Sequence, residues 1–210
     1  MKMFKCLFFL FALPAACLSS FGQGSRALLF REDWKETPAA LPVTQAHVAN
    51  PDLILALYGP GRDAIKKSNH PQIPNDPYYI WSGECKGNWA VTLQRKSKAI
   101  DLSGDAMIAI RSKQSGFRQL RLVLKLVAGD WLVSDEAMGA TDDWTEKEFH
   151  MARIRWRKLN IDTITEGAWA DNPDLSKVDE IGLTDLMSGG GTPASSRLDW
   201  IAVYGKTASR

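Results

Sequence analysis

Three carboxylates near the C-terminus have a spacing that bears on catalysis, because glycoside hydrolysis needs two carboxyl groups across the scissile bond. Asp179, Glu180 and Asp185 lie on one predicted strand, Val178–Leu186. Side chains alternate along a strand, so Asp179 and Asp185 share a face. An E-x-D-x-x-E arrangement is absent, as are the G-x-S-x-G, H-E-x-x-H and C-x-x-C patterns and a phosphate loop ending in G-K-[ST]. Binding is therefore favoured over catalysis, which stays as the alternative.

Histidines and cysteines add little reactive chemistry. The three histidines are widely spaced and do not form a metal-binding pattern. Of the cysteines, Cys6 and Cys17 lie in the N-terminal apolar segment, so only Cys85 stays in a chain from which that segment is removed. One thiol makes no intramolecular disulfide, and the core must supply the stability. We expect Cys85 to be a small buried side chain in a turn-rich segment rather than a nucleophile.

The aromatic residues suggest a binding surface. Eight tryptophans are many for this length, and several aromatics stand beside Gly, Pro or Asn in predicted loops. A flat ring matches the apolar face of a sugar, and planar amides and guanidiniums bind hydroxyls or carboxylates. The alternative is that the rings pin a long loop to the core and the bases form a solvated face. The residues expected to line one concave ligand-binding surface are Tyr79, Trp81, Asn88, Arg111, Gln119, Arg121 and Trp169.

Period-two patterns predict strands as the elements that position these residues. Arg118–Leu126 is the clearest case, with a leucine at every second position on the inner face. The C-terminal strand Arg197–Tyr204 is apolar on both faces, which is typical of a central strand. A Gly-rich turn, Gly189–Gly191, follows the predicted strand Val178–Leu186. Further strands are expected at Ala27–Arg31, Trp89–Gln94, Ala106–Lys113, Trp131–Ser134 and Trp144–His150. Asp52–Tyr58 could be a strand or a short helix, and Ile154–Leu159 alternates basic and apolar residues.

The overall pattern predicts an all-β sandwich. Eight or nine strands are expected, with no long amphipathic helix and no internal repeat. Seven of the ten prolines fall between Pro38 and Pro77, so most of that region is expected to be loop. With 210 residues, 45% of them hydrophobic, the chain suits one domain with a sizeable core. A formal net charge of +2 argues against a dedicated nucleic-acid binder.

The N-terminus has the pattern of an export signal. A basic start, Met1–Lys5, precedes an apolar segment, Cys6–Leu18, that is too short to span a membrane. Small residues follow, and cleavage is expected near Gly22 or Gln23. Residues 1–23 are therefore predicted to be a signal peptide and residues 24–210 the sandwich domain, in a secreted or periplasmic protein without a transmembrane segment. The alternative is a lipoprotein anchored at Cys17, which follows two alanines.

A series of short motifs in the second half resembles the galactose-binding-domain-like jelly rolls. Among proteins of this type, the series is similar to family 11 carbohydrate-binding modules and to the complex I intermediate-associated proteins of similar fold. It covers about Asp101 to Gly205, and the Pro-rich first third does not match. The motifs are Asp101-Leu102-Ser103-Gly104, Leu120–Leu126 with Gly129-Asp130-Trp131, Pro173-Asp174-Leu175-Ser176, Val178-Asp179-Glu180-Ile181-Gly182, and Leu198-Asp199-Trp200-Ile201.

The resemblance also implies a structural calcium ion that joins the first strand to the last. The matching positions are Glu32 or Asp33 and Asp199, and backbone carbonyls would have to complete the six to eight oxygen ligands. Alternation places Asp199 on the Ile201 side, where a carboxylate entering a core must be paired. The alternative is that Asp199 pairs with an arginine or caps backbone amides.

The function that these observations favour is non-catalytic glycan binding outside the cell. A polysaccharide-processing enzyme, either a glycoside hydrolase or a lyase, is the first alternative. A structural or adhesive surface protein is the second. The expected partner is a glycan or polysaccharide, and the sequence does not indicate an oligomeric state.

Overall fold

The computed structural model describes residues 27–187 and 193–209. The predicted signal peptide, the lipidation site at Cys17 and the turn Gly189–Gly191 lie outside the described residues. Within them, helix is limited to three one-turn 3-10 helices, η1 (Gln45–His47), η2 (Arg62–Ala64) and η3 (Met151–Arg153). No helix in this part of the chain is long and apolar enough to cross a membrane.

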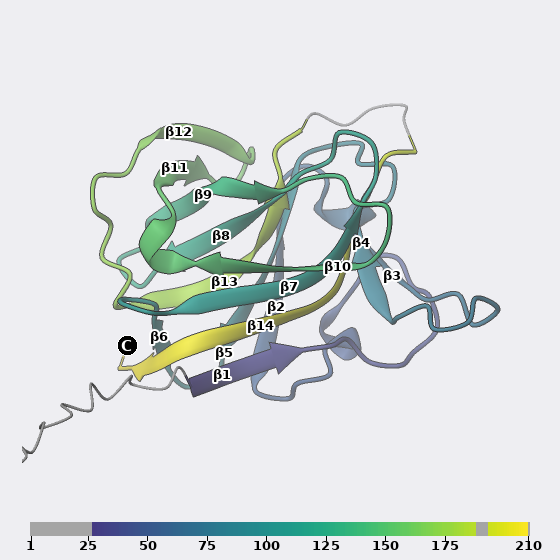
Figure 1. The fold of residues 1–210 in the computed structure, drawn as a ribbon, viewed down its shortest axis with the longest axis horizontal. Helices are drawn as coiled ribbons and strands as arrows, with labels where there is room; N and C mark the ends of the chain where they lie inside the picture. Colours follow the sequence, from purple (N-terminus) through teal and green to yellow (C-terminus); the bar gives the residue numbers. More distant parts are fainter. Residues whose placement is uncertain (1–26, 188–192, 210) are drawn as a thin grey trace, which may run out of the picture.

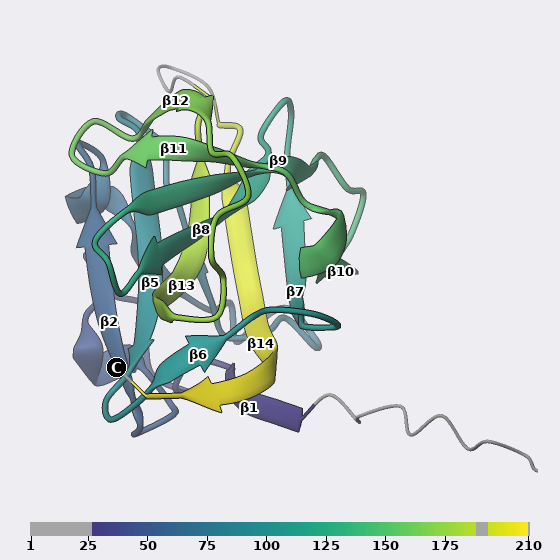
Figure 2. The ribbon, with the colours of Figure 1, turned by 90° about the vertical axis from the view of Figure 1, so that its left-hand side faces the viewer.

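Two layers of antiparallel strands face each other across one core (Figures 1 and 2). The layer that we call the β7 sheet contains β10 (Thr145–His150), β7 (Met107–Gln114), β14 (Ser196–Ala208), β1 (Ala27–Glu32), β4 (Tyr79–Trp81) and β3 (Lys66–Ser68). The β8 sheet contains β2 (Leu53–Tyr58), β5 (Trp89–Arg95), β13 (Val178–Asp185), β8 (Leu120–Leu126), β9 (Trp131–Met138), β11 (Trp156–Asn160) and β12 (Thr165–Trp169). The expected all-β sandwich is confirmed.

The long strand β14 is central, as its apolar faces predicted. It pairs with β7 along one side and with β1 and β4 along the other. Its last residues pair with the short strand β6 (Ala99–Asp101), which also pairs with β13 of the β8 sheet. Ile201 and Val203 are buried toward the core, and Trp200 is covered on the outer face by Arg31, whose guanidinium lies 4.1 Å from the ring centre. β14 therefore joins the two layers covalently and by hydrogen bonds.

Asp199 does not follow the expected alternation. The register between β14 and β7 shifts between Leu198 and Trp200, as at a β-bulge. The extra residue turns Asp199 to the outer face of the sheet, where its carboxylate meets Arg111, 2.5 Å away. A bulge inserts one unpaired residue into a strand, so residue parity cannot be carried across it.

The core is built largely as the period-two patterns predicted. Leu120, Leu122 and Leu124 of β8 are fully buried, as are Ile108 and Ile110 of β7 on the facing layer. The expected turn before Trp131 is present, with Gly129 in the left-handed region at φ 101° and its N–H donating to the Leu126 carbonyl. At that φ a residue other than glycine would be strained.

More strands form than the sequence suggested. The described residues contain fourteen, and two of them replace predicted loops: β4, which holds Tyr79 and Trp81, and β12, which ends at Trp169. The Pro-rich region also contains β2 and β3, and it contributes buried Val43, Val48 and Ile65 to the core. Short strands between prolines and turns have too little periodicity to be recognised, because their partners lie far away in sequence.

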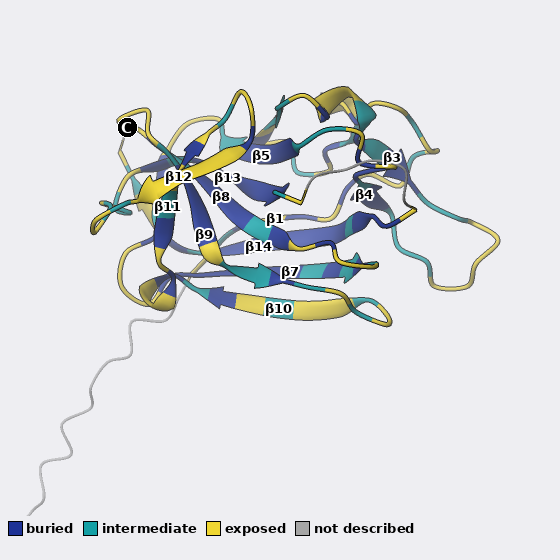
Figure 3. Ribbon diagram, turned by 90° about the horizontal axis from the view of Figure 1, so that it is seen from above, coloured by how far each residue is buried: buried dark blue, intermediate teal, exposed yellow. Residues whose placement is uncertain are grey.

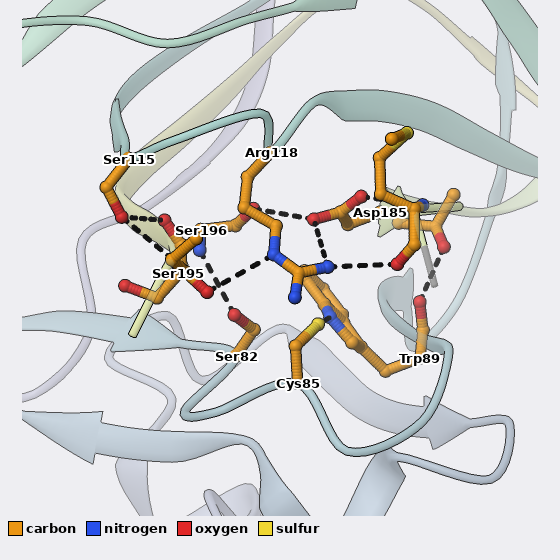
Figure 4. Close-up of polar contacts among 11 residues, drawn as sticks. Ser82, Cys85, Trp89, Ser115, Arg118, Asp185, Ser195 and Ser196 are labelled. Carbon is orange, nitrogen blue, oxygen red and sulfur yellow. Dashed lines mark hydrogen bonds and ion pairs between the residues drawn. The ribbon is translucent and has the colours of Figure 1, made fainter. Parts of the chain in front are cut away.

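A buried guanidinium connects the layers at one end of the sandwich (Figure 4). Arg118, in the connection from β7 to β8, is fully buried. Its Nε donates to the Ala194 carbonyl at 3.2 Å and its Nη1 to the Met187 carbonyl at 2.9 Å. Nη1 also lies 3.5 Å from the carboxylate of Asp185, which is itself fully buried. The side chain thus joins the start of β8 to the end of β13 and to the residues that lead into β14.

Asp185 extends this connection across the sandwich. One oxygen accepts the Met187 N–H at 2.9 Å, and the other accepts the Ser196 hydroxyl of β14 at 3.2 Å. The Ser196 N–H in turn donates to the Ser82 hydroxyl at 3.1 Å. Burial raises the pKa of the Asp185 carboxyl, while these donors and Arg118 act to lower it. Asp185 therefore needs these hydrogen-bond donors and Arg118 to stabilise its charged form.

Cys85 lies beside this cluster and has the structural role that the sequence suggested. It is buried, and its sulfur accepts the indole N–H of Trp89 at 3.2 Å (Figure 4). Burial raises the pKa of its thiol. Since the thiolate is the nucleophilic form of cysteine, a buried thiol with a raised pKa is poorly reactive.

We expect Arg118→Met to destabilise the protein by about 3–5 kcal/mol at neutral pH, because it leaves the buried Asp185 carboxylate without its cation. Without Arg118, the folded-state pKa of Asp185 lies further above its unfolded value of about 3.9, so the folded variant binds the proton more tightly. The loss of stability relative to wild type should therefore shrink as the pH falls from 7 toward 5. Urea unfolding of both proteins at the two pH values measures this.

The matched control for that prediction removes both partners. Arg118→Met combined with Asp185→Leu should recover much of the lost stability, since apolar replacement of a buried pair is often close to neutral. A loss that is the same at both pH values, and that the second substitution does not reduce, would contradict the assigned pairing.

Gly182→Ala should destabilise the centre of the β8 sheet. A Cβ atom there would lie 1.9 Å from the Val91 carbonyl oxygen and 2.6 Å from the Thr92 Cα of the neighbouring strand β5. Overpacking against backbone that two sheet partners hold in place costs about 3 kcal/mol, the upper end of the usual range. Gly139→Ala is the control, because no atom lies within 4 Å of its Cβ position. Equal thermal unfolding midpoints for the two variants would refute this account.

Candidate functional site

The residues expected to form one concave surface lie on two different layers. The connection that contains Arg118 carries the chain from the β7 sheet to the β8 sheet, so Arg111 and Arg121 point outward from opposite sides of the sandwich. Sequence alternation shows that each points outward, but it cannot show that consecutive strands belong to different layers. The single surface is therefore corrected to two groups. Tyr79, Trp81 and Arg111 lie on the β7 sheet; Asn88, Arg121 and Trp169 belong to the β8 sheet; Gln119 is exposed in the connection.

The group on the β7 sheet is occupied by contacts within the protein. Tyr79 is buried and packs on Trp144, with ring centres 5.2 Å apart, and burial raises the pKa of its hydroxyl. The Arg111 guanidinium lies 5.7 Å from the Trp144 ring and pairs with Asp199. The Trp81 ring has the Lys66 ammonium at 4.8 Å. These contacts hold β3, β4 and β10 against the sheet, which is the alternative role that the sequence left open for the rings.

The carboxylates expected at a calcium site also have protein partners. Glu32 is buried and accepts the backbone N–H groups of Trp34, Ala49 and Asn50 at 2.8, 2.7 and 2.9 Å. Burial raises the pKa of its carboxyl, and the three N–H donors act to lower it. Asp33 pairs with Arg31 at 2.7 Å. Glu32 therefore anchors the loop around Asn50 to the end of β1.

Asp199 is paired with Arg111, which is the second role that the sequence allowed for it. Burial raises the pKa of the Asp199 carboxyl, and Arg111 acts to lower it. The described residues contain no group of three or more His, Cys, Asp or Glu side chains that could hold a metal ion. With N–H and guanidinium donors on these oxygens, the donor set as it stands does not fit the six to eight oxygen ligands of calcium.

On the other layer, the β11–β12 hairpin folds over the outer face of the β8 sheet. Ile164 at its tip is fully buried and packs in one cluster with Ala90, Val123 and Val133. Figure 2 shows the hairpin at the upper edge of this layer, and Figure 3 shows that β12 is exposed along its length. The hairpin thus closes part of the sheet face with apolar side chains.

Two of the residues predicted to bind a ligand make contacts that hold this hairpin. The Asn88 side-chain amide donates to the Ile164 carbonyl at 3.1 Å. The Arg121 guanidinium donates to Glu166 of β12 at 2.9 Å. Both therefore position the hairpin, and the residues at its base are left to form a site.

A surface pocket opens at the base of the hairpin, beside Trp169. It has a volume of about 210 Å³ and is lined by residues 154–156 and 169–173. Two apolar cavities inside the sandwich have only about 10 Å³ each, on the order of the space that one water molecule needs. Trp169 is the exposed tryptophan of this pocket, with 38% of its surface accessible.

Two arginines flank the Trp169 ring. The guanidiniums of Arg155 and Arg157 lie 4.0 and 4.1 Å from its centre. Arg157 pairs with Trp169 across the hairpin, donates to the Gly167 carbonyl at 3.0 Å and lies 3.8 Å from Glu166. A guanidinium over an indole face is a favourable cation–π contact. Trp169 is thereby held in place at the mouth of the pocket.

The residues that line the pocket include both hydrogen-bond donors and hydrogen-bond acceptors. Asp171 and Asn172 follow the end of β12, and Asn172 adopts the left-handed backbone conformation at φ 44°. Asparagine tolerates this conformation better than most residues. Arg155, Arg157, Asp171 and Asn172 were not predicted from the sequence as site residues. The alternation of basic and apolar residues in Ile154–Leu159 was the available signal, but the register with Trp169 was not readable.

A second polar cluster on the same layer is internally satisfied. The Glu180 carboxylate is buried and accepts hydrogen bonds from Tyr58 at 2.9 Å, Thr92 at 2.6 Å and Lys125 at 2.9 Å. Asp179 accepts the Gln94 amide at 2.8 Å. Hydrogen bonds from these three side chains occupy the oxygens of the buried Glu180 carboxylate and keep them from a substrate. This cluster therefore supports the sheet, and a catalytic carboxylate pair is not evident here.

The fold is similar to solved carbohydrate-binding modules of jelly-roll type. One is the family 11 module of a cellulosomal cellulase of Clostridium thermocellum, with 12% identity, a TM-score of 0.44, and coverage of 87% of this chain and 95% of that one. Another is a mutant of the family 29 module CBM29-2 complexed with cellulohexaose, with 13% identity, a TM-score of 0.44, and coverage of 80% and 91%. A third is TmCBM61 in complex with β-1,4-galactotriose, with 9% identity, a TM-score of 0.41, and coverage of 74% and 90%.

No protein-family model matches the chain, and no curated protein matches it in sequence. The likenesses above concern the fold and place no ligand in this chain.

Calcium binding between the first and last strands stays a prediction. A calcium ion would have to displace Arg111 from Asp199. If it does, calcium should raise the melting temperature, because a ligand that binds only the folded state stabilises it, and Asp199→Ala should abolish the rise. Scanning calorimetry with calcium and with a chelator measures both. A wild-type melting temperature that calcium leaves unchanged would exclude the site.

Proposed function

We propose that this protein is a secreted, non-catalytic glycan-binding protein whose site is the pocket beside Trp169. The observation that carries the proposal is an accessible tryptophan held at the mouth of a pocket with polar side chains on its rim. Ligand pockets commonly combine apolar and aromatic walls with a few convergent polar groups. Of the seven residues that the sequence suggested, Trp169 is the one in this environment.

The chemistry of the rim suits a sugar. The accessible part of the Trp169 indole offers apolar surface beside the two guanidiniums. The Asn172 amide both donates and accepts, and the Asp171 carboxylate accepts from hydroxyls. Arg155, which lines the same pocket 4.0 Å from the ring centre, adds N–H donors. A saccharide ring presents an apolar face with hydroxyls around its edge, so these groups are complementary to it.

Non-catalytic binding is favoured over hydrolysis by the surroundings of the carboxylates. Asp185 is fully buried against Arg118, and Glu180 accepts three hydrogen bonds. Neither is placed to protonate a leaving group in the pocket. A polysaccharide-processing enzyme stays as the alternative, and it is separated from binding by assaying reducing ends or unsaturated products after incubation with polysaccharides.

Trp169→Ala should weaken glycan binding by roughly thirtyfold, since truncation of a central aromatic anchor commonly costs about 2 kcal/mol. A glycan array identifies a ligand, and isothermal titration calorimetry of both proteins with that ligand measures the loss. Phe117→Ala is the matched control, because Phe117 is also an exposed aromatic, at 51%, but does not line the pocket.

Two outcomes of these binding measurements would contradict the proposal. If wild type, Trp169→Ala and Phe117→Ala bind every glycan with the same affinity, the pocket is not the site. If no glycan binds at all, the structural or adhesive alternative is favoured.

A further inference from the structure

We propose that the Trp169 pocket selects acidic glycans, with Arg155 binding the carboxylate of a uronic acid residue; this inference rests on the glycan-binding function proposed above. The arginines of this chain differ in whether a carboxylate lies beside them. Arg111, Arg121 and Arg157 each lie near a carboxylate, at 2.5, 2.9 and 3.8 Å. Arg155 is exposed and lines the pocket, and its side chain makes no hydrogen bond or ion pair with the described residues.

The Trp169 ring constrains this unpaired guanidinium. The guanidinium carbon lies 4.0 Å from the ring centre. Because its N–H groups make no hydrogen bond with the described residues, they are available to a ligand. A guanidinium presents two parallel N–H donors that match the two oxygens of a carboxylate, and ring contact reduces the freedom lost on binding. Arg155 is thus prepared for an anion at the pocket mouth.

Asp171 limits where the anion can be placed. Asp171 also lines the pocket, and its negative charge would repel an anion placed beside it. Its oxygens accept hydrogen bonds from hydroxyl groups well. A ligand with a carboxylate directed to Arg155 and hydroxyls directed to Asp171 and Asn172 satisfies all three side chains. A uronic acid residue has both kinds of group on one ring, whereas a neutral sugar leaves Arg155 without an anion.

The experiment compares oligogalacturonate with the same oligosaccharide after reduction of its carboxyl groups. By isothermal titration calorimetry at low salt, wild type should bind the acidic form at least tenfold more tightly, and the ratio should fall as salt is added, because salt screens exposed charges. Arg155→Gln should bring the ratio close to one, because it lowers the affinity for the acidic form much more than the affinity for the reduced form. A sulfated galactan oligosaccharide is the second anionic probe, and binding weaker than that of oligogalacturonate is expected.

Arg153→Gln is the matched control. Arg153 is exposed and two residues earlier in the chain, but it does not line the pocket, so its variant should keep the wild-type preference. An equal loss of preference in both variants would show that general positive charge, not Arg155, attracts the ligand, and would overturn the inference.

The outcomes separate this inference from the function on which it rests. If wild type binds the reduced oligosaccharide as tightly as the acidic one, and Trp169→Ala weakens both, glycan binding stands and the selection of acidic glycans fails. If neither form binds and Trp169→Ala changes nothing for any glycan, both fail. If the sulfated probe binds more tightly than oligogalacturonate, the uronic acid assignment is overturned.

Discussion

The Arg118–Asp185 pair is the constraint on which the end of the sandwich depends. Most of the interface between the two layers is apolar and non-directional, and it would tolerate small shifts of one layer over the other. The buried guanidinium removes that freedom, because its carbonyl partners come from residues on both sides of the β13–β14 connection. Asp185 adds a bond to Ser196 at the start of β14. A charge that is buried must keep its partners, so this geometry is fixed.

The fixed start of β14 has consequences along the whole strand. β14 runs through the β7 sheet and ends on β6 beside the β8 sheet, so its placement sets the relation of the two layers. The bulge at Asp199 then turns a carboxylate outward to Arg111 instead of into the core. Charge pairs thus act on β14 at two points: the buried Arg118–Asp185 pair reaches it through Ser196, and Asp199 pairs with Arg111 on the outer face.

The β11–β12 hairpin both closes a surface and creates one. Its tip places Ile164 on the outer face of the β8 sheet, where Asn88 and Arg121 hold it. Its base leaves Trp169 accessible beside the 169–173 segment. The rings on the β7 sheet have the same chemical character, but their partners differ: Tyr79 is buried against Trp144, whereas Trp169 has arginines and solvent around it. Environment rather than residue type therefore separates a structural aromatic from a candidate ligand contact.

The sequence by itself determined the fold class and the direction in which many side chains point. Alternation in Arg118–Leu126 placed the leucines inward, and Arg118 has the same parity, as Asp185 has with Ile181 and Leu183. The sequence could therefore predict that Arg118 points inward and, separately, that Asp185 points inward. Their pairing could not be predicted, because it depends on the chain crossing from one layer to the other between β7 and β8. The same crossing divided the predicted binding surface in two, and hairpin register alone brought Arg157 opposite Trp169. Local periodicity depends on neighbouring residues, whereas layer assignment and register depend on contacts between residues far apart in sequence.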